Sequence, residues 1–155
     1  MEDPQAYSYK IDTIYFDYMK AFDTVPHERL LHKLKGYGMS KEIIEWIRDF
    51  ITGRRQKVKV NGAGSSWANV TSGVPQGSIL GPLLFILFIN ELPMKVDGEI
   101  LLFADDTKLF HQVESRADQQ SLQKDIDTMF NWSVEWDLTF HPDKCKGYEA
   151  RIKQH

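Results

Sequence analysis

The order of apolar and polar residues predicts strands and helices in alternation along the chain. Residues 11–16 are rich in β-branched and aromatic side chains, which is typical of a buried strand, and Asp17 ends this segment. Pro26 follows a short polar cluster and indicates the start of a helix. Ser40 is a suitable N-cap for a second helix, whose apolar residues recur at helical spacing until Gly53.

The central part of the chain predicts a hairpin and then an apolar helix. Residues 57–60 alternate in polarity, Asn61-Gly62 is a strong hairpin-turn signal, and residues 67–70 are the expected return strand. Residues 79–92 are apolar nearly all round the helix that they predict, so we expect this helix to lie inside the domain.

The last third predicts a second hairpin and a long helix. In residues 99–110, apolar strand-like segments flank a turn that carries Asp105 and Asp106. Residues 115–136 read as an amphipathic helix and residues 138–140 as a short final strand, whereas no pattern is evident beyond residue 147. Strands and hairpins mixed with helices predict an α+β fold, with a mainly antiparallel sheet and helices packed against it. No linker or repeat divides the sequence, so residues 1–155 are expected to form a single domain.

Composition limits the class of protein. The hydrophobic fraction of 42% and the charged fraction of 26% are those of a globular domain. The lone cysteine, Cys145, excludes an internal disulfide and a cysteine-based zinc site, and suits a reducing compartment. There is no signal-peptide pattern, and the longest apolar run, residues 82–89, is too short to span a bilayer.

The net charge of −3 does not suit a nucleic-acid-binding protein, for which a basic domain is expected. Basic patches nevertheless occur at residues 54–59 and 144–146. Such a run is compatible with a solvated face and with a nucleic-acid contact.

The adjacent carboxylates of Asp105 and Asp106 have two interpretations. Aspartate is common in solvated turns. Two like charges at one bend also repel each other, and a divalent hard cation would make the pair favourable. If the strand that ends at Asp17 neighbours this hairpin, all three carboxylates meet at one edge of the sheet, where they could hold two Mg²⁺ ions about 3.5–4 Å apart. Asp17 as a solvent-facing strand-end residue remains the alternative.

Four short motifs follow one another along the chain. Residues 15–25 (YFDYMKAFDTV), 72–82 (SGVPQGSILGP), 103–106 (FADD) and 140–144 (FHPDK) resemble motifs A, B, C and D of the reverse transcriptases of non-LTR (LINE-type) retrotransposons. His141 departs from the asparagine that is usual at its position in motif D.

The resemblance implies the palm of a right-hand polymerase that extends a DNA primer on an RNA template with deoxynucleoside triphosphates. It implies two ions of Mg²⁺ or Mn²⁺ as cofactors. Asp17 and Asp105 correspond to the main metal ligands and catalytic residues, with Asp106 in support. The backbone carbonyl of Tyr18 corresponds to a further metal ligand.

The resemblance also implies substrate contacts. Phe22 corresponds to the aromatic residue that excludes a 2′-hydroxyl, whereas without the resemblance a core aromatic is the favoured interpretation. Gln76 and Gly77 correspond to the loop that approaches the nucleotide and template, or form an ordinary turn. Ala104 lies among the substrate-binding residues of motif C. Lys144 corresponds to the motif D lysine that protonates or pairs with the leaving pyrophosphate, and is otherwise a surface lysine.

The motifs cover residues 11–147, so the fingers and thumb of the parent polyprotein are expected to lie outside this chain. The fragment alone is then expected to be inactive, and no membrane contact is expected. The location implied for a retroelement protein is intracellular, in the nucleus and cytoplasm. The alternatives are a catalytically inactive remnant that binds RNA or protein, a group II intron-type maturase, and an RNA-dependent RNA polymerase. The last is disfavoured by Phe22.

Overall fold

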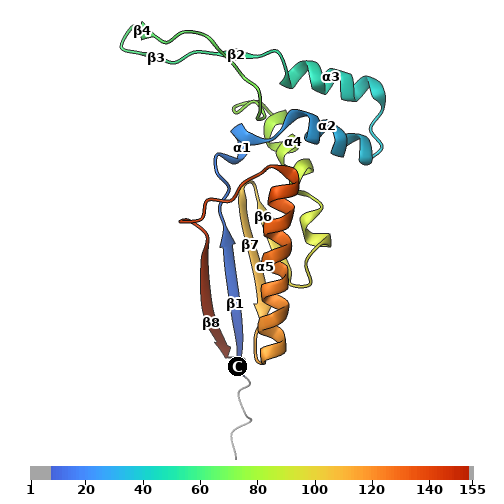
Figure 1. The fold of residues 1–155 in the computed structure, drawn as a ribbon, viewed down its shortest axis with the longest axis vertical. Helices are drawn as coiled ribbons and strands as arrows, with labels where there is room; N and C mark the ends of the chain where they lie inside the picture. Colours follow the sequence, from blue (N-terminus) through green and yellow to red (C-terminus); the bar gives the residue numbers. More distant parts are fainter. Residues whose placement is uncertain (1–7, 154–155) are drawn as a thin grey trace, which may run out of the picture. The chain divides into compact units, whose positions relative to one another are not determined.

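The computed structural model describes residues 8–153, which form two compact units (Figure 1). The sheet unit contains residues 8–19, 91–135 and 139–153. The helical unit contains residues 20–90 and 136–138. Each unit is described by itself below.

The sheet unit is built on four antiparallel strands in the order β6-β7-β1-β8. These strands are β1 (Ser8–Phe16), β6 (Glu99–Phe103), β7 (Asp106–Gln112) and β8 (Lys146–Lys153). In the ladder between β1 and β7, Ile11 pairs with Gln112 and Phe16 with Thr107. β1 is an inner strand of the sheet, in agreement with its β-branched and aromatic residues.

A single long helix, α5 (Arg116–Trp136), runs along the sheet (Figure 1). Leu122, Met129 and Trp132 are buried at helical spacing, and this burial attaches the amphipathic helix to its unit. The carboxylate of Asp118 accepts hydrogen bonds from the backbone N–H and the hydroxyl of Ser115, so the helix start is well capped. The short 3₁₀ helix η1 (Leu92–Met94) precedes β6.

Four helices form the body of the helical unit. They are α1 (Ala21–Thr24), α2 (His27–Gly36), α3 (Lys41–Ile51) and α4 (Leu80–Ile89). Ser40 caps α3 as expected, because its hydroxyl accepts a hydrogen bond from the N–H of Ile43. Buried apolar residues of α2, α3 and α4 form the core of this unit. No described helix has the length and apolar character needed to cross a membrane.

Between α3 and α4 the chain forms an extended double-stranded arm, residues 54–70, which projects from the helices of its own unit (Figure 1). Its strands are β2 (Arg55–Gln56), β3 (Lys59–Val60), β4 (Ala63–Gly64) and β5 (Ala68–Asn69), with β2 paired to β5 and β3 to β4. Asn61 and Gly62 have φ values of 48° and 84°, as a tight hairpin turn requires.

The α+β class and the antiparallel sheet are confirmed, and three details of the sequence prediction are wrong. Strand β8 was missed, because an exposed edge strand has polar residues on both faces. Helix α4 is shorter than residues 79–92, and it exposes Leu83 and Ile86. Residues 138–140 contribute only an isolated bridge between Phe140 and Tyr18.

Candidate functional site

The sheet places Asp17 and the acidic hairpin at one end of the ladder between β1 and β7. The last pair of that ladder is Phe16 with Thr107. Asp17 directly follows Phe16, and Asp106 directly precedes Thr107. The predicted neighbourhood of β1 and the acidic hairpin is therefore confirmed, since Asp17 and Asp106 are adjacent in sequence to the same pair of residues.

Asp105 lies in the tight turn that joins β6 to β7. Phe103 pairs with Asp106, so Ala104 and Asp105 are the two residues of the turn. Ala104 has a φ of 52°, a left-handed conformation that is uncommon for a residue with a Cβ atom. Asp105 and Asp106 are both exposed, so their carboxylates are accessible from solvent.

Lys144 is brought to Asp17 by the turn that follows Phe140. Its Nζ lies 3.6 Å from Oδ1 of Asp17, and the two side chains are 59% and 42% exposed. The backbone N–H of His141 donates a hydrogen bond of 2.7 Å to the backbone carbonyl of Asp17, which fixes the turn beside the end of β1. Two residues from motifs more than 120 positions apart in the sequence thus meet at one place.

Tyr18 is buried, and its side chain is part of the core of the sheet unit. Its ring stacks on Phe140 with 4.7 Å between the centroids, and its hydroxyl is 3.5 Å from the hydroxyl of Thr107. Burial raises the pKa of Tyr18 well above its usual range, so the phenol stays neutral. The role expected for Tyr18 in metal binding involves its backbone carbonyl and not its side chain. Burial of the side chain is therefore compatible with that role.

A basic cavity of about 410 Å³ lies beside Lys144 in the sheet unit. Its lining residues are Tyr15, Asp143, Lys144, Lys146 and Tyr148. The rings of Tyr15 and Tyr148 meet edge to face, with centroids 5.3 Å apart. Two lysines against one aspartate make this cavity suited to an anionic ligand.

The remaining predicted site residues lie in the helical unit. Phe22 is half-buried, and its ring packs on Phe85 with 4.7 Å between the centroids. The amide of Gln76 donates a hydrogen bond of 2.9 Å to Oδ1 of Asp23, which joins the motif B loop to the end of motif A. Gly77 has a φ of 79°, a conformation that favours glycine.

A polar cavity of about 550 Å³ opens beside that hydrogen bond. Its lining includes Lys20, Asp23, Arg54 and Gln76. The guanidinium of Arg54 donates to the backbone carbonyls of Ile51 and Gly73 at 2.8 and 2.7 Å. Burial lowers the pKa of Arg54, but an arginine remains protonated near neutral pH. The loop of motif B is thus held by charged side chains of its own unit.

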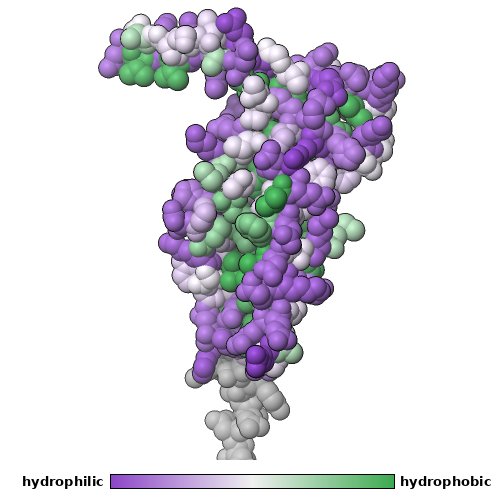
Figure 2. Space-filling view, in the orientation of Figure 1, coloured by the Kyte–Doolittle hydropathy of each residue, from purple (hydrophilic) through white to green (hydrophobic). Residues whose placement is uncertain are grey.

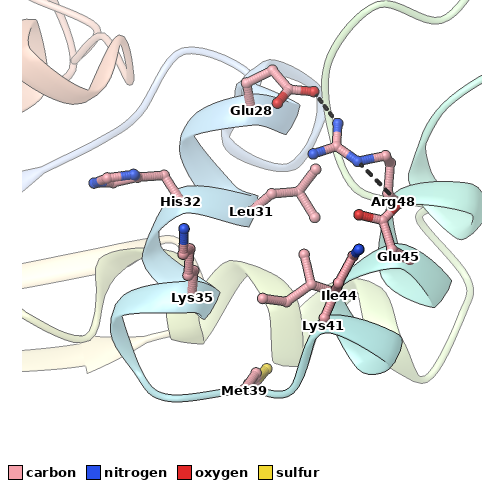
Figure 3. Close-up of a pocket in the computed structure, with 9 residues that line it drawn as sticks. All are labelled: Glu28, Leu31, His32, Lys35, Met39, Lys41, Ile44, Glu45 and Arg48. Atoms are coloured by element: carbon pink, nitrogen blue, oxygen red, sulfur yellow. Dashed lines mark hydrogen bonds and ion pairs between the residues drawn. The ribbon is translucent and has the colours of Figure 1, made fainter.

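A second cleft in the helical unit, about 530 Å³ between α2 and α3, contains none of the predicted site residues (Figure 3). Arg48 bridges Glu28 and Glu45 at one side of the cleft. The lining contains acidic and basic side chains as well as the apolar residues Leu31 and Ile44. Such a mixture is typical of the groove between two packed helices.

The chemistry of the carboxylates at the end of the sheet fits a divalent hard cation, because such ions take aspartate oxygens. Within residues 8–153, however, no group of three or more histidine, cysteine, aspartate or glutamate side chains is arranged to hold a metal ion. Magnesium completes its shell with water and substrate phosphates and needs only one or two carboxylates. The donors that are present fit a sparse site of that kind.

Sequence reasoning missed a buried carboxylate that anchors the other end of the acidic hairpin. Asp125 is 1% exposed, and it accepts hydrogen bonds from the backbone N–H groups of Asp97 and Gly98 at 3.0 and 2.8 Å. Nε2 of His111 lies 2.7 Å from the same carboxylate. In the sequence, Asp125 follows Leu122 by three residues, so both lie on the core-facing side of α5. An acidic residue at a core-facing helix position could have indicated a buried, hydrogen-bonded carboxylate.

Comparison with known proteins finds similarity to one protein family over almost all of the described residues. The family model described as "Reverse transcriptase (RNA-dependent DNA polymerase)" matches residues 9–153. The RNA-directed DNA polymerase from mobile element jockey of Drosophila funebris is 34% identical over 143 residues, which is 84% of this chain and 15% of that protein. The probable RNA-directed DNA polymerase from transposon X-element of Drosophila melanogaster is 30% identical over 92% of this chain and 16% of its own length.

The fold is also found in a solved structure. Apo telomerase from Candida tropicalis superposes with a TM-score of 0.66 at 17% sequence identity, over 91% of this chain and 31% of that one. At this identity the similarity shows the fold alone. This chain spans about 15% of the length of the jockey polymerases that it matches.

Proposed function

Since the chain belongs to the reverse transcriptase (RNA-dependent DNA polymerase) family and is related to the polymerases of non-LTR retrotransposons, we propose that it is part of the palm of an RNA-directed DNA polymerase. The reaction joins the 3′-hydroxyl of a DNA primer to the α-phosphate of a deoxynucleoside triphosphate and releases pyrophosphate. RNA is the template. The observation that carries this proposal is the meeting of Asp17, the acidic hairpin and Lys144 at one end of the sheet.

In this proposal Asp17, Asp105 and Asp106 hold two Mg²⁺ or Mn²⁺ ions together with the backbone carbonyl of Tyr18. Such ions activate the attacking oxygen and neutralise charge on the leaving group. The exposure of Asp105 and Asp106 supports this role, because the substrate phosphates must reach the same place.

The other residues position the substrate and move a proton. Lys144 donates a proton to the leaving pyrophosphate or neutralises it, and its position beside Asp17 and the basic cavity supports that role. The half-buried ring of Phe22 excludes a 2′-hydroxyl. Gln76, Gly77 and Ala104 contact the incoming nucleotide or the template.

The proposal is tested by the effect of Mn²⁺ on thermal unfolding of the chain. An ion at tenfold its Kd stabilises the folded state by about 1.4 kcal/mol, which raises the Tm by roughly 3–6 °C for a chain of this size. Asp17→Asn and Asp105→Asn should abolish this rise. The control is Asp127→Asn, since Asp127 is an exposed residue of α5. If all four proteins respond equally to Mn²⁺, the carboxylates of Asp17 and Asp105 do not bind the ion.

Lys144 should weaken metal binding, because its ammonium group lies 3.6 Å from a carboxylate oxygen of Asp17. Exposed ion pairs at such distances are worth at most about 1 kcal/mol. We therefore expect Lys144→Gln to bind Mn²⁺ about two- to fivefold more tightly, measured by calorimetry. A variant with unchanged or lower affinity would show that the ion pair and the metal do not compete.

A further inference from the structure

The arm formed by residues 54–70 carries positive charge that is out of balance with the rest of the protein. It contains four basic residues and no acidic residue, in a chain whose net charge is −3. Among residues 8–153, no carboxylate lies within ion-pair distance of Arg55, Lys57 or Lys59. Positive charges concentrated on one projecting element, with no internal partner, are typical of a nucleic-acid contact.

Two of these cations, Arg55 and Lys57, lie against an aromatic ring of the arm. Arg55 lies in β2 and Lys59 in β3, and Lys57 lies in the short segment that joins these two strands, so all three cations belong to the same side of the hairpin sequence. Arg55 pairs with Asn69 and Gln56 with Ala68, and Trp67 directly precedes Ala68 in the chain. Nζ of Lys57 lies 4.9 Å from the centroid of the Trp67 ring, and the guanidinium carbon of Arg55 lies 5.5 Å from it.

Trp67 is held in place by these cations and remains 54% exposed. An indole that is exposed to this extent contributes little to the core of the helical unit. A ring on which a nucleic-acid base stacks must be exposed in this way. The surface of the arm carries hydrophilic and hydrophobic side chains side by side (Figure 2). Val58 and Val60 account for exposed apolar surface on the arm.

We propose that this arm binds a single-stranded nucleic acid, with Arg55, Lys57 and Lys59 on its phosphates and one base stacked on Trp67. The ring distinguishes this ligand from an acidic peptide, because every base offers a π-face and an acidic side chain does not. The proposal rests on the proposed function only for the source of the strand, which would be the template.

The experiment measures binding of the whole chain to fluorescein-labelled 15-mers by anisotropy, between 50 and 300 mM KCl. The probes are oligouridine, oligodeoxythymidine and a DNA duplex of the same length. Lys57→Gln/Lys59→Gln should lower the slope of log K against log salt by about 1.4, since each phosphate contact to a single strand contributes about 0.7. Trp67→Ala should weaken binding to both single strands roughly 5- to 100-fold and change the slope little.

Matched variants control for charge and for loss of an indole. Lys35→Gln/Lys41→Gln removes the same charge from exposed positions on α2 and the start of α3. Trp46→Ala removes a tryptophan on α3 that is 57% exposed. Both controls should bind as the wild type does, and circular dichroism should show all variants folded.

The proposal is overturned if no single strand binds at 50 mM KCl. It is also overturned if Trp67→Ala equals Trp46→Ala, or if the duplex binds as tightly as the single strands. Asp127→Asn should bind normally, because Asp127 is exposed on α5 and lies outside the arm. A chain that fails the Mn²⁺ test but keeps arm-dependent binding would reject the polymerase site and retain the arm.

Discussion

Primer extension should fall about a thousandfold when Asp105 is replaced by asparagine in a polymerase that carries this segment. The assay uses a jockey-type polymerase in which residues 9–153 replace the matching segment, because this chain spans only about 15% of such a protein. Asparagine preserves the shape of the side chain and removes its charge. Charge stabilisation in a two-metal centre is worth several kcal/mol, and about 4 kcal/mol corresponds to a thousandfold change in rate.

The same graft provides its controls. Asp127→Asn should extend the primer at the rate of the unsubstituted graft, since Asp127 is exposed on α5 and bonds only to Gln123 among the hydrogen bonds described for it. Equal rates for Asp105→Asn and the parent graft would remove Asp105 from the reaction. A folded graft that is inert with both Mg²⁺ and Mn²⁺ would favour the alternative of a catalytically inactive remnant.

Replacing Asp125 by alanine should lower the free energy of unfolding by roughly 3–5 kcal/mol. The substitution removes a buried carboxylate and leaves the N–H groups of Asp97 and Gly98 and the ring of His111 without their acceptor. Breaking a buried charged network on one side costs that much, because the remaining polar groups stay buried. Urea unfolding followed by far-UV circular dichroism measures the change.

Asp127→Ala is the matched control, two residues further along the same helix. Its carboxylate is exposed, so the expected loss is below about 0.5 kcal/mol. A loss for Asp125→Ala as small as that of the control would mean that the open end of the acidic hairpin is held by other contacts.

The contribution of Asp125 should also depend on pH. Burial raises the pKa of this carboxyl, but hydrogen bonds from His111 and from the backbone of Asp97 and Gly98 outweigh it, so the net pKa is lowered. A carboxyl with a lowered pKa in the folded state stabilises the protein above its unfolded pKa of about 3.9. That stabilisation is lost as the pH falls through the folded-state pKa. The stability difference between wild type and Asp125→Asn should therefore shrink as the pH falls below about 4.

Local signals predicted the elements that carry the motifs. Apolar residues in β1 and around the acidic turn had strand-forming side chains, and Ser40 and Asn61-Gly62 carried explicit cap and turn chemistry. Such signals depend only on neighbours in the chain, so they were readable without the structure. The order of the four motifs then indicated the family.

Features that depend on contacts between distant parts of the chain could not be predicted from the sequence. Strand β8 has the composition of an exposed edge, and its partner β1 is more than 130 residues away in the sequence. The hydrogen bonds of Asp125 join α5 to a loop 27 residues earlier. The roles of Phe22 and Gln76 remain predictions, because they depend on contacts with a substrate and not only on contacts within the chain.

The two outer strands of the sheet have a consequence for handling the protein. β6 and β8 each have one side without a strand partner in the described sheet, and β6 exposes Leu101 and, at 80%, Phe103. Edges with exposed apolar side chains can pair with the same edge of another molecule. The charged residues Lys146, Glu149 and Arg151 oppose this on β8, so concentrated samples should self-associate through β6. Leu101→Lys would be a practical way to keep the chain monomeric.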